Sequence, residues 1–208
     1  MLERITRRER SDLLIAWLAI SIAFSLVFIR GGVTLELFLV FLLVSMVTVG
    51  IGFILHEMAH KFTAMKYGFW AEFQKDNLML LVAVAMAALV GVVFAAPGAT
   101  LIYGTYISRE QNGKISAAGP AVNLALCGIF ALLLWASGTV FLPFLSRNLL
   151  SLIGMVGLQV NAMIAAFNML PVSVLDGKKI LAWNPVVFAI MIVAAFGILL
   201  ASYFPAIL

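Results

Sequence analysis

Residues 34–62 read TLELFLVFLLVSMVTVGIGFILHEMAHKF, an apolar run long enough to cross a membrane that carries His56-Glu57-Met58-Ala59-His60 near its end. Positions i and i+4 of a helix lie on one face, so the two imidazoles can bind the same metal ion. Glu57 would then lie beside the open position of that metal, where it could accept a proton from a bound water. The stretch therefore predicts a metal-hydrolase site inside a membrane helix.

A purely structural role for this motif would require two core histidines and a buried glutamate with no cation beside them. His56 and His60 are the only histidines among the 208 residues. An ionised acid near the centre of a bilayer costs at least about 2.5–3.5 kcal/mol, a cost that a bound divalent cation would offset. We therefore favour the metal site.

The composition indicates an integral membrane protein, with 64% hydrophobic and 11% charged residues and a mean hydropathy of +1.16. We expect a single membrane domain over residues 1–208, with no soluble module of ordinary size. The net charge of +4 is typical of the basic flanks of membrane helices, so no nucleic-acid partner is expected. The single cysteine, Cys127, lies in an apolar stretch and is expected to serve packing.

Six apolar stretches approach the length of about 20 residues that a membrane helix needs. They are residues 12–30, 34–62, 77–98, 117–138, 148–170 and 185–205. The first follows four arginines and is not followed by a small-x-small cleavage pattern, so it predicts an uncleaved first helix with a cytoplasmic N-terminus.

The distribution of positive charge favours a re-entrant segment at residues 77–98. If all six stretches cross, eight basic residues lie on the cytoplasmic side and five on the outer side. If residues 77–98 enter and return on the same side, eleven basic residues lie on the cytoplasmic side and two on the outer side, which fits the positive-inside rule better. The predicted fold is therefore an all-α polytopic membrane protein with five to six transmembrane helices, a re-entrant segment and a short β-hairpin-like element.

Residues 100–107 read as one arm of that hairpin and residues 114–116 as the start of its return, after a polar turn at 108–113. An exposed edge there could pair with an extended substrate, or the segment could be a simple connector.

A catalytic zinc site normally has three protein ligands, so one acid should join the two histidines. Asp176 is favoured because Pro171 would interrupt a helix before it and Gly177 would permit a tight backbone course after it. The re-entrant arrangement also brings Asp176 to the same side of the membrane as the histidines.

The other acids are less well placed for this role. Glu72 and Asp76 remain alternatives close to the histidine helix, whereas Glu9 and Asp12 read as part of the charged N-terminus. The structural alternative for Asp176 is an ordinary helix-exit turn, with Lys178 or Lys179 neutralising the carboxylate.

Three segments together resemble the site-2 protease family of intramembrane zinc metalloproteases. They are Leu55-His56-Glu57-Met58-Ala59-His60, Gly119-Pro120-Ala121-Val122-Asn123 and the N-x-x-P-x-x-x-x-D-G pattern from Asn168 to Gly177. The matching core covers roughly residues 34–185, and no PDZ or CBS domain is evident, so we expect a compact form. About sixty residues separate His60 from Pro120, which departs from the family pattern.

The resemblance implies one Zn²⁺ per chain held by His56, His60 and Asp176, with Glu57 as general base. It implies cleavage of transmembrane protein substrates within the lipid bilayer, and a contact of Asn168 with substrate or oxyanion. We expect the plasma membrane of a prokaryote, with the N-terminus and the site towards the cytoplasm; the oligomeric state stays open.

Other functions remain compatible with the residues. A different membrane zinc peptidase could use Glu72 as third ligand, and a non-enzymatic metal-ion transporter or a silent zinc-binding scaffold could use the same cluster. Asn123 and Asn161 are expected to bond between helices, and the same role is the open alternative for Asn168. Gly50 and Gly52 are expected to permit close helix approach.

Overall fold

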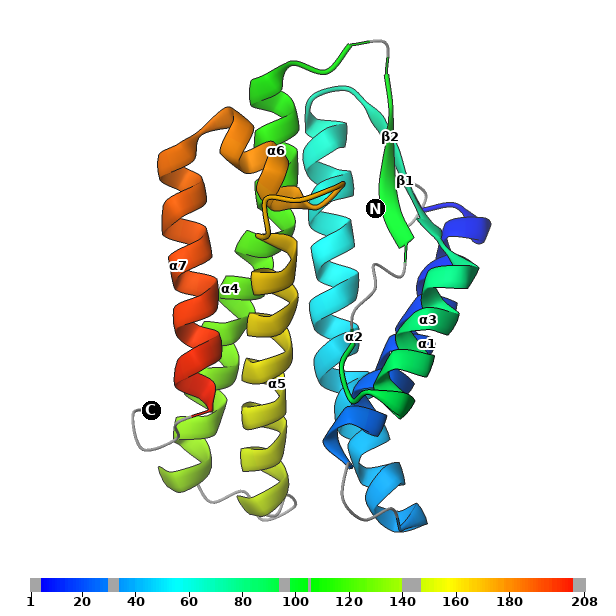
Figure 1. Cartoon of the computed structure of the whole chain (residues 1–208), viewed down its shortest axis with the longest axis vertical. Coiled ribbons are helices and arrows are strands. Elements are labelled where there is room, and N and C mark those ends of the chain that lie inside the picture. The colour runs from blue at the N-terminus through cyan, green and yellow to red at the C-terminus, as the bar shows by residue number, and fades with distance from the viewer. Residues whose placement is uncertain (1–4, 30–33, 94–97, 105, 140–146, 204–208) are drawn as a thin grey trace.

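The computed structural model describes residues 5–29, 34–93, 98–104, 106–139 and 147–203 (Figure 1). Within these ranges the order of elements is α1 (Arg7–Phe28), α2 (Leu35–Lys66), β1 (Trp70–Lys75), α3 (Asn77–Leu89), β2 (Gly98–Tyr103), α4 (Arg109–Thr139), α5 (Arg147–Asn168), α6 (Asp176–Trp183) and α7 (Pro185–Ser202).

Five helices, α1, α2, α4, α5 and α7, are long and apolar enough to cross a membrane. They run along the long axis of the molecule (Figure 1). The helix α3 has 13 residues and is only about 20 Å long, too short for the hydrocarbon core of about 30 Å. The predicted all-α polytopic fold is confirmed, and the five candidate spans among the described residues agree with the predicted five to six.

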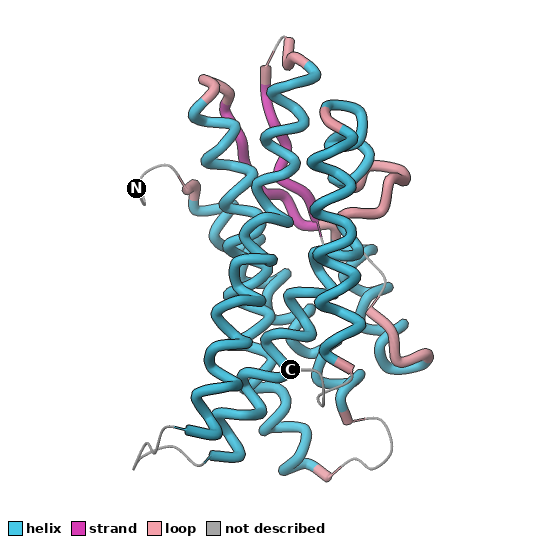
Figure 2. The backbone as a smooth tube through the Cα atoms, turned by 90° about the vertical axis from the view of Figure 1, so that its left-hand side faces the viewer, coloured by secondary structure: helices cyan, strands magenta, loops and turns pink. Residues whose placement is uncertain are grey.

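The re-entrant segment begins and ends at a two-stranded antiparallel sheet. Trp70 pairs with Tyr103 at one end of the ladder, and Lys75 pairs with Gly98 at the other. The chain therefore leaves the sheet at Lys75, forms α3 and re-enters the sheet at Gly98 beside its starting point, so both strands lie on the same side. Figure 2 shows both strands towards one end of the helix bundle.

The predicted hairpin is correct in its strand but wrong in its partner. Residues 98–103 form β2, which pairs with β1 and not with residues 114–116. Those residues lie in α4, which starts with a capping box: the Ser108 hydroxyl accepts from the amide of Gln111 at 3.2 Å, and the Gln111 side chain accepts from the amide of Ser108 at 3.0 Å. The polar composition that suggested a turn belongs to the first turns of a helix.

The helix α2 lies at the centre of the structure and packs against α1, α4, α5 and both strands. Its glycines make room for large neighbours, as expected. A Cβ at Gly50 would lie 2.0 Å from Nε1 of Trp17, whose indole donates to the carbonyl of Met46 at 2.8 Å. A Cβ at Gly52 would lie 2.5 Å from Oδ1 of Asn161 on α5.

A buried ion pair joins α1, α2 and β1. Nζ of Lys61 donates to Oε2 of Glu9 at 2.5 Å, and both side chains are fully buried. The other carboxylate oxygen of Glu9 accepts from the backbone amide of Phe73 at 3.1 Å. Nζ of Lys75 lies 4.0 Å from Asp12, which is also buried. Glu9 and Asp12 belong to the charged N-terminal segment as expected, but they are buried there because the sheet packs against the start of α1.

Candidate metal centre

Two histidines of α2 and the first residue of α6 bring three potential ligand atoms together. Nε2 of His56 lies 2.9 Å from Nε2 of His60, and Oδ2 of Asp176 lies 3.5 and 3.1 Å from these two nitrogens. All three residues are buried. Among the described residues, they form the group of His, Cys, Asp and Glu side chains whose geometry could hold a metal ion. We call this group the histidine–aspartate cluster.

The other ring nitrogen of each histidine faces an oxygen that must accept a hydrogen bond. Nδ1 of His60 lies 2.8 Å from the carbonyl oxygen of Ile115, and Nδ1 of His56 lies 2.6 Å from Oδ1 of Asn123. Each Nδ1 therefore carries the hydrogen, which leaves the Nε2 lone pairs directed at each other and at the carboxylate. A cation, either a shared proton or a metal ion, would join these atoms. Two imidazoles and one carboxylate match the ligand set of a catalytic zinc site.

The backbone of α4 leaves space beside these ligand atoms because residue 119 is glycine. A Cβ at Gly119 would lie 2.4 Å from Nε2 of His60 and 2.6 Å from Nε2 of His56. Any side chain would therefore occupy the place where a shared cation must lie. The donor set and this space together fit a bound zinc ion.

Asp176 reaches the histidines because α5 ends at Asn168 and the chain turns before α6. A Cβ at Gly177 would lie 2.1 Å from the carbonyl oxygen of Met169, so the start of α6 packs directly on the end of α5. Asp176 lies in the first turn of α6, where the helix dipole favours a carboxylate.

The two oxygens of the Asp176 carboxylate have different neighbours. Oδ2 faces the histidines, whereas Oδ1 lies 3.9 Å from Nζ of Lys179, so both sequence-based expectations for Asp176 are partly realised. Burial alone would raise the pKa of Asp176, but positive charge on the adjacent imidazoles lowers this pKa below its ordinary value. A cation shared with the neutral rings would act in the same direction and keep the carboxylate ionised.

Glu57 is buried next to His56 and is held by the sheet. The hydroxyl of Thr100 on β2 donates to Oε2 of Glu57 at 2.8 Å and lies 3.3 Å from its backbone oxygen. The sequence suggested a strand at Thr100 but no contact with Glu57. This hydrogen bond restricts the carboxylate to one orientation beside the cluster.

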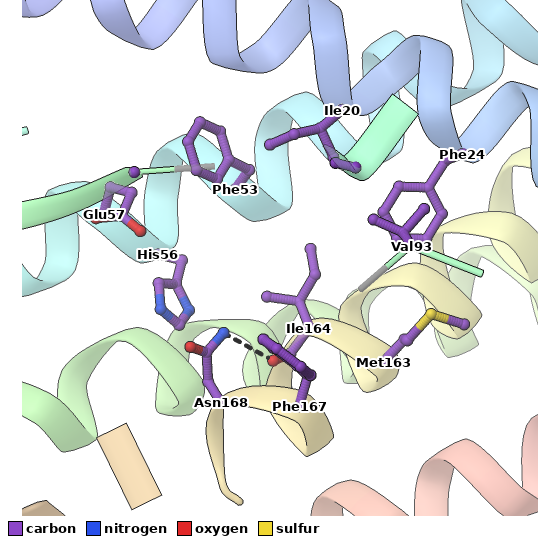
Figure 3. Close-up of a pocket in the computed structure, with 12 residues that line it drawn as sticks. Ile20, Phe24, Phe53, His56, Glu57, Val93, Met163, Ile164, Phe167 and Asn168 are labelled. Atoms are coloured by element: carbon purple, nitrogen blue, oxygen red, sulfur yellow. Dashed lines mark hydrogen bonds between the residues drawn. The ribbon is translucent and has the colours of Figure 1, made fainter. Parts of the chain in front are cut away.

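Two adjoining cavities of about 90 Å³ meet at the cluster. They share His56, Glu57, Gly98 and Asn168. The apolar cavity extends between α1, α2 and α5, and Figure 3 shows several of its lining side chains, which include Ile20, Phe24, Phe53, Met163, Ile164 and Phe167. The polar cavity is lined by His60, Thr100, Ser116, Asp176 and Lys179, among others. The candidate site thus lies where an apolar cavity meets a polar one.

Asn168, the last residue of α5, borders both cavities. Its Nδ2 donates to the carbonyl oxygen of Ile164 at 3.0 Å, and its side chain lies beside His56 (Figure 3). This position is compatible with the expected substrate contact.

The alternative acids lie elsewhere. Oε1 of Glu72 accepts from the hydroxyl of Thr6 at 2.5 Å, and Oδ1 of Asp76 caps α3 by accepting from the amides of Leu78 and Met79 at 2.9 and 3.0 Å. The structure does not bring either acid to His56 and His60.

Sequence reasoning missed four contributors to the site: the hydroxyl of Thr100, the carbonyl of Ile115, the space at Gly119 and the amide of Asn123. Asn123 does bond between helices as expected, since its Nδ2 lies 3.0 Å from Oδ1 of Asn161, but it also holds His56. Gly119 and Asn123 belong to a segment that carried the family resemblance. That segment was the available signal for their importance.

Comparison with known proteins supports a metalloprotease. No family model matches the chain, and no solved structure matches it at a significant level. A protein of Methanocaldococcus jannaschii that is provisionally named a zinc metalloprotease is 38% identical over 201 residues, which cover 97% of this chain and 97% of the relative. The chain therefore belongs to the same zinc metalloprotease family as this relative.

Proposed function

We propose that the protein is an intramembrane zinc metalloprotease of the site-2 protease type that hydrolyses peptide bonds in or near transmembrane segments of membrane proteins. The observation that carries this proposal is the place of the histidine–aspartate cluster. Its two histidines lie on a candidate membrane span, at the junction of an apolar cavity and a more polar one. Such a junction can receive an apolar peptide from one side and water from the other.

His56, His60 and Asp176 would hold one zinc ion per chain. Zinc, when bound, lowers the pKa of a bound water towards about 7 and polarises a carbonyl group. Glu57 accepts the proton of the attacking water and returns it to the leaving amine. Thr100 keeps the carboxylate of Glu57 in place through the 2.8 Å hydrogen bond. Asn168 is the candidate donor to the oxygen of the scissile carbonyl, because it borders both cavities.

The depth of the site suits a reaction that needs both lipid-derived substrate and water. The helix α2 has 32 residues and is about 48 Å long, which exceeds the hydrocarbon thickness of about 30 Å. His56 and His60 lie in the last third of this helix, closer to its Lys66 end. Water would reach them through the polar cavity.

The substrate must be extended at the scissile bond, because the amides of a helix are shielded by their own turns. The strand β2 carries Thr100 against Glu57 and pairs with β1 on one side. A substrate strand that pairs with the other edge of β2 would lie close to the general base. This pairing is our preferred account of substrate binding.

The distribution of basic residues supports an orientation with the site towards the cytoplasm, in what we expect to be the plasma membrane of a prokaryote. Ten basic residues belong to the start of α1, the end of α2, β1, the start of α4 and α6, namely Arg7, Arg8, Arg10, Lys61, Lys66, Lys75, Arg109, Lys114, Lys178 and Lys179. These parts of the chain lie towards the end of the molecule that holds the sheet and α6 (Figure 1). Arg147 begins α5 at the opposite end. The positive-inside rule places the richer end in the cytoplasm.

The test is cleavage of single-span membrane proteins by the purified chain in detergent or liposomes with zinc, beside a Glu57→Gln variant. We expect cleavage by the parent chain and none by the variant, which keeps the size of the side chain but cannot accept the proton. Equal cleavage by both proteins would overturn the assignment of Glu57. Stoichiometric zinc without cleavage, together with metal flux across sealed vesicles, would instead support a transporter.

A further inference from the structure

A chain of hydrogen bonds runs from the backbone of α5 to His56. Nδ2 of Asn161 donates to the carbonyl oxygen of Gly157 at 2.8 Å, and Oδ1 of Asn161 accepts from Nδ2 of Asn123 at 3.0 Å. Oδ1 of Asn123 then lies 2.6 Å from Nδ1 of His56. The chain thus passes through three helices: α5, α4 and α2.

The direction of this chain is fixed by backbone carbonyls, which can only accept. The Gly157 carbonyl requires the amide nitrogen of Asn161 on its side, so the oxygen of Asn161 must face Asn123. Nδ2 of Asn123 also donates to the carbonyl oxygen of Gly52 at 3.2 Å. This second acceptor keeps Nδ2 away from His56, so Oδ1 of Asn123 faces His56. Reversal of either amide would place an oxygen against an oxygen.

The chain is isolated from water, because Asn123 and Asn161 are both 0% exposed. A buried amide that loses its partner cannot replace it with solvent. The space for Asn161 exists only because residue 52 is glycine, whose Cβ would lie 2.5 Å from Oδ1 of Asn161. The arrangement therefore depends on a specific approach of α2 to α5.

We propose that Asn161 is a positioning residue of the metal centre, which sets the tautomer and ring orientation of His56 through Asn123. This inference rests on the proposed zinc site and adds to it a residue that touches neither the metal ligands nor the cavities. The proton on Nδ1 of His56 is held away from the cluster, and the lone pair of Nε2 is directed into it. Outer hydrogen-bond partners of this kind orient ligating histidines and raise metal affinity.

The two histidines differ in how they are held. His60 bonds directly to the carbonyl of Ile115, which no side-chain substitution can remove, whereas His56 depends on two side-chain amides. The effect of Asn161 should therefore reach the metal through His56 alone.

The test measures zinc affinity of the full chain in detergent by competition with a chelator, and the absorption spectrum of the Co²⁺-substituted protein. We expect Asn123→Leu to weaken zinc binding by roughly 10–100-fold, and Asn161→Leu to weaken it by about tenfold with an altered Co²⁺ spectrum. Asn161→Asp keeps the oxygen that faces Asn123 and, as the protonated acid favoured by full burial, can donate its O–H to the carbonyl of Gly157, so its affinity should stay within about threefold of the parent.

Cys127→Ala is the matched control. Cys127 lies one turn after Asn123 on α4 and faces the carbonyl of Leu158 on α5, so it probes the same helix contact without reaching the cluster. Its zinc affinity and Co²⁺ spectrum should equal those of the parent even if stability falls.

Unchanged affinity and spectrum in a folded Asn161→Leu protein would overturn the inference, as would equal losses in Asn161→Leu and Asn161→Asp. If the leucine variant does not fold, Asn161→Ala supplies the same comparison without adding an apolar group. Failure of the proposed zinc site is a separate result: the parent chain would then bind no zinc, or His60→Ala would bind zinc as tightly as the parent.

Discussion

Two buried polar clusters occupy neighbouring positions on α2, and they differ in whether their charges are satisfied. In the Glu9–Lys61 pair, the cation and the anion lie 2.5 Å apart, and the remaining oxygen of Glu9 accepts from the amide of Phe73. In the histidine–aspartate cluster, two nitrogen lone pairs and a carboxylate oxygen face one another. The first cluster is complete within the protein, whereas the second requires a cation.

This difference separates a structural cluster from a site. Successive residues of a helix point about 100° apart, so His60 and Lys61 face different neighbours although they are adjacent in sequence. The side chain of Lys61 contacts Glu9 of α1 and Trp70 of β1. The side chain of His60 contacts Ile115 of α4 and Asp176 of α6. Burial alone would not have distinguished the two clusters, because both lie inside the bundle.

The largest effect should follow from filling the space beside the histidines. Gly119→Ala would place a Cβ within 2.6 Å of both Nε2 atoms, so we expect stoichiometric zinc binding to be lost. Gly128→Ala on the same helix is the control, because nothing lies within 4 Å of its Cβ. Metal analysis of both purified variants makes the comparison, and full zinc content in Gly119→Ala would contradict the proposed position of the ion.

Removal of the lysine from the buried Glu9–Lys61 pair should lower the stability of the protein and leave metal binding unchanged. Lys61→Met leaves Glu9 buried without its partner and should lower the free energy of unfolding by about 3–5 kcal/mol. Addition of Glu9→Gln should recover a large part of this loss. Denaturation in detergent measures the free energy of unfolding of both variants. A Lys61→Met protein as stable as the parent would contradict the structural role of the pair.

A smaller effect on the reaction should follow from releasing Glu57. Thr100→Val removes the hydroxyl but keeps the shape, so we expect cleavage to slow by about tenfold or more through misplacement of the general base. Zinc content should not change, and Thr100→Ser should restore most of the rate. Parent-like cleavage by Thr100→Val would show that the sheet does not position Glu57.

The smallest effect should come from the cap of α3. Asp76→Ala removes the oxygen that accepts from the amides of Leu78 and Met79 and should cost about 1 kcal/mol of stability. Asn77→Ala, one residue further on, leaves this cap in place and serves as control. Loss of zinc from Asp76→Ala would revive the alternative in which Asp76 is a ligand.

Much of this architecture could be predicted from local pattern and charge. The i, i+4 spacing of His56 and His60 predicts their common face, and the distribution of basic residues predicts that 77–98 returns to its own side. Asp176 followed from the need for a third ligand and from the breaks at Pro171 and Gly177. Each of these inferences uses residues that are close in sequence or a property summed over whole segments.

The missed features depend on contacts between distant segments. Glu9 is buried because Lys61, 52 residues later, lies beside it, and β1 pairs with a strand that starts 23 residues after β1 ends. The contact of Asn123 with His56 depends on the rotation and height of α4 relative to α2, which composition does not determine. The start of α4 was missed for a local reason, because the capping box of Ser108 and Gln111 lies in a segment whose polar composition resembles a turn.

The central claim is that Asp176 completes a zinc site with His56 and His60, and the most direct test is the zinc content of three purified proteins. The parent chain should carry one zinc ion, Asp176→Ala should lose it, and Glu72→Ala should retain it. Zinc retained by Asp176→Ala, or lost only in Glu72→Ala, would contradict the account.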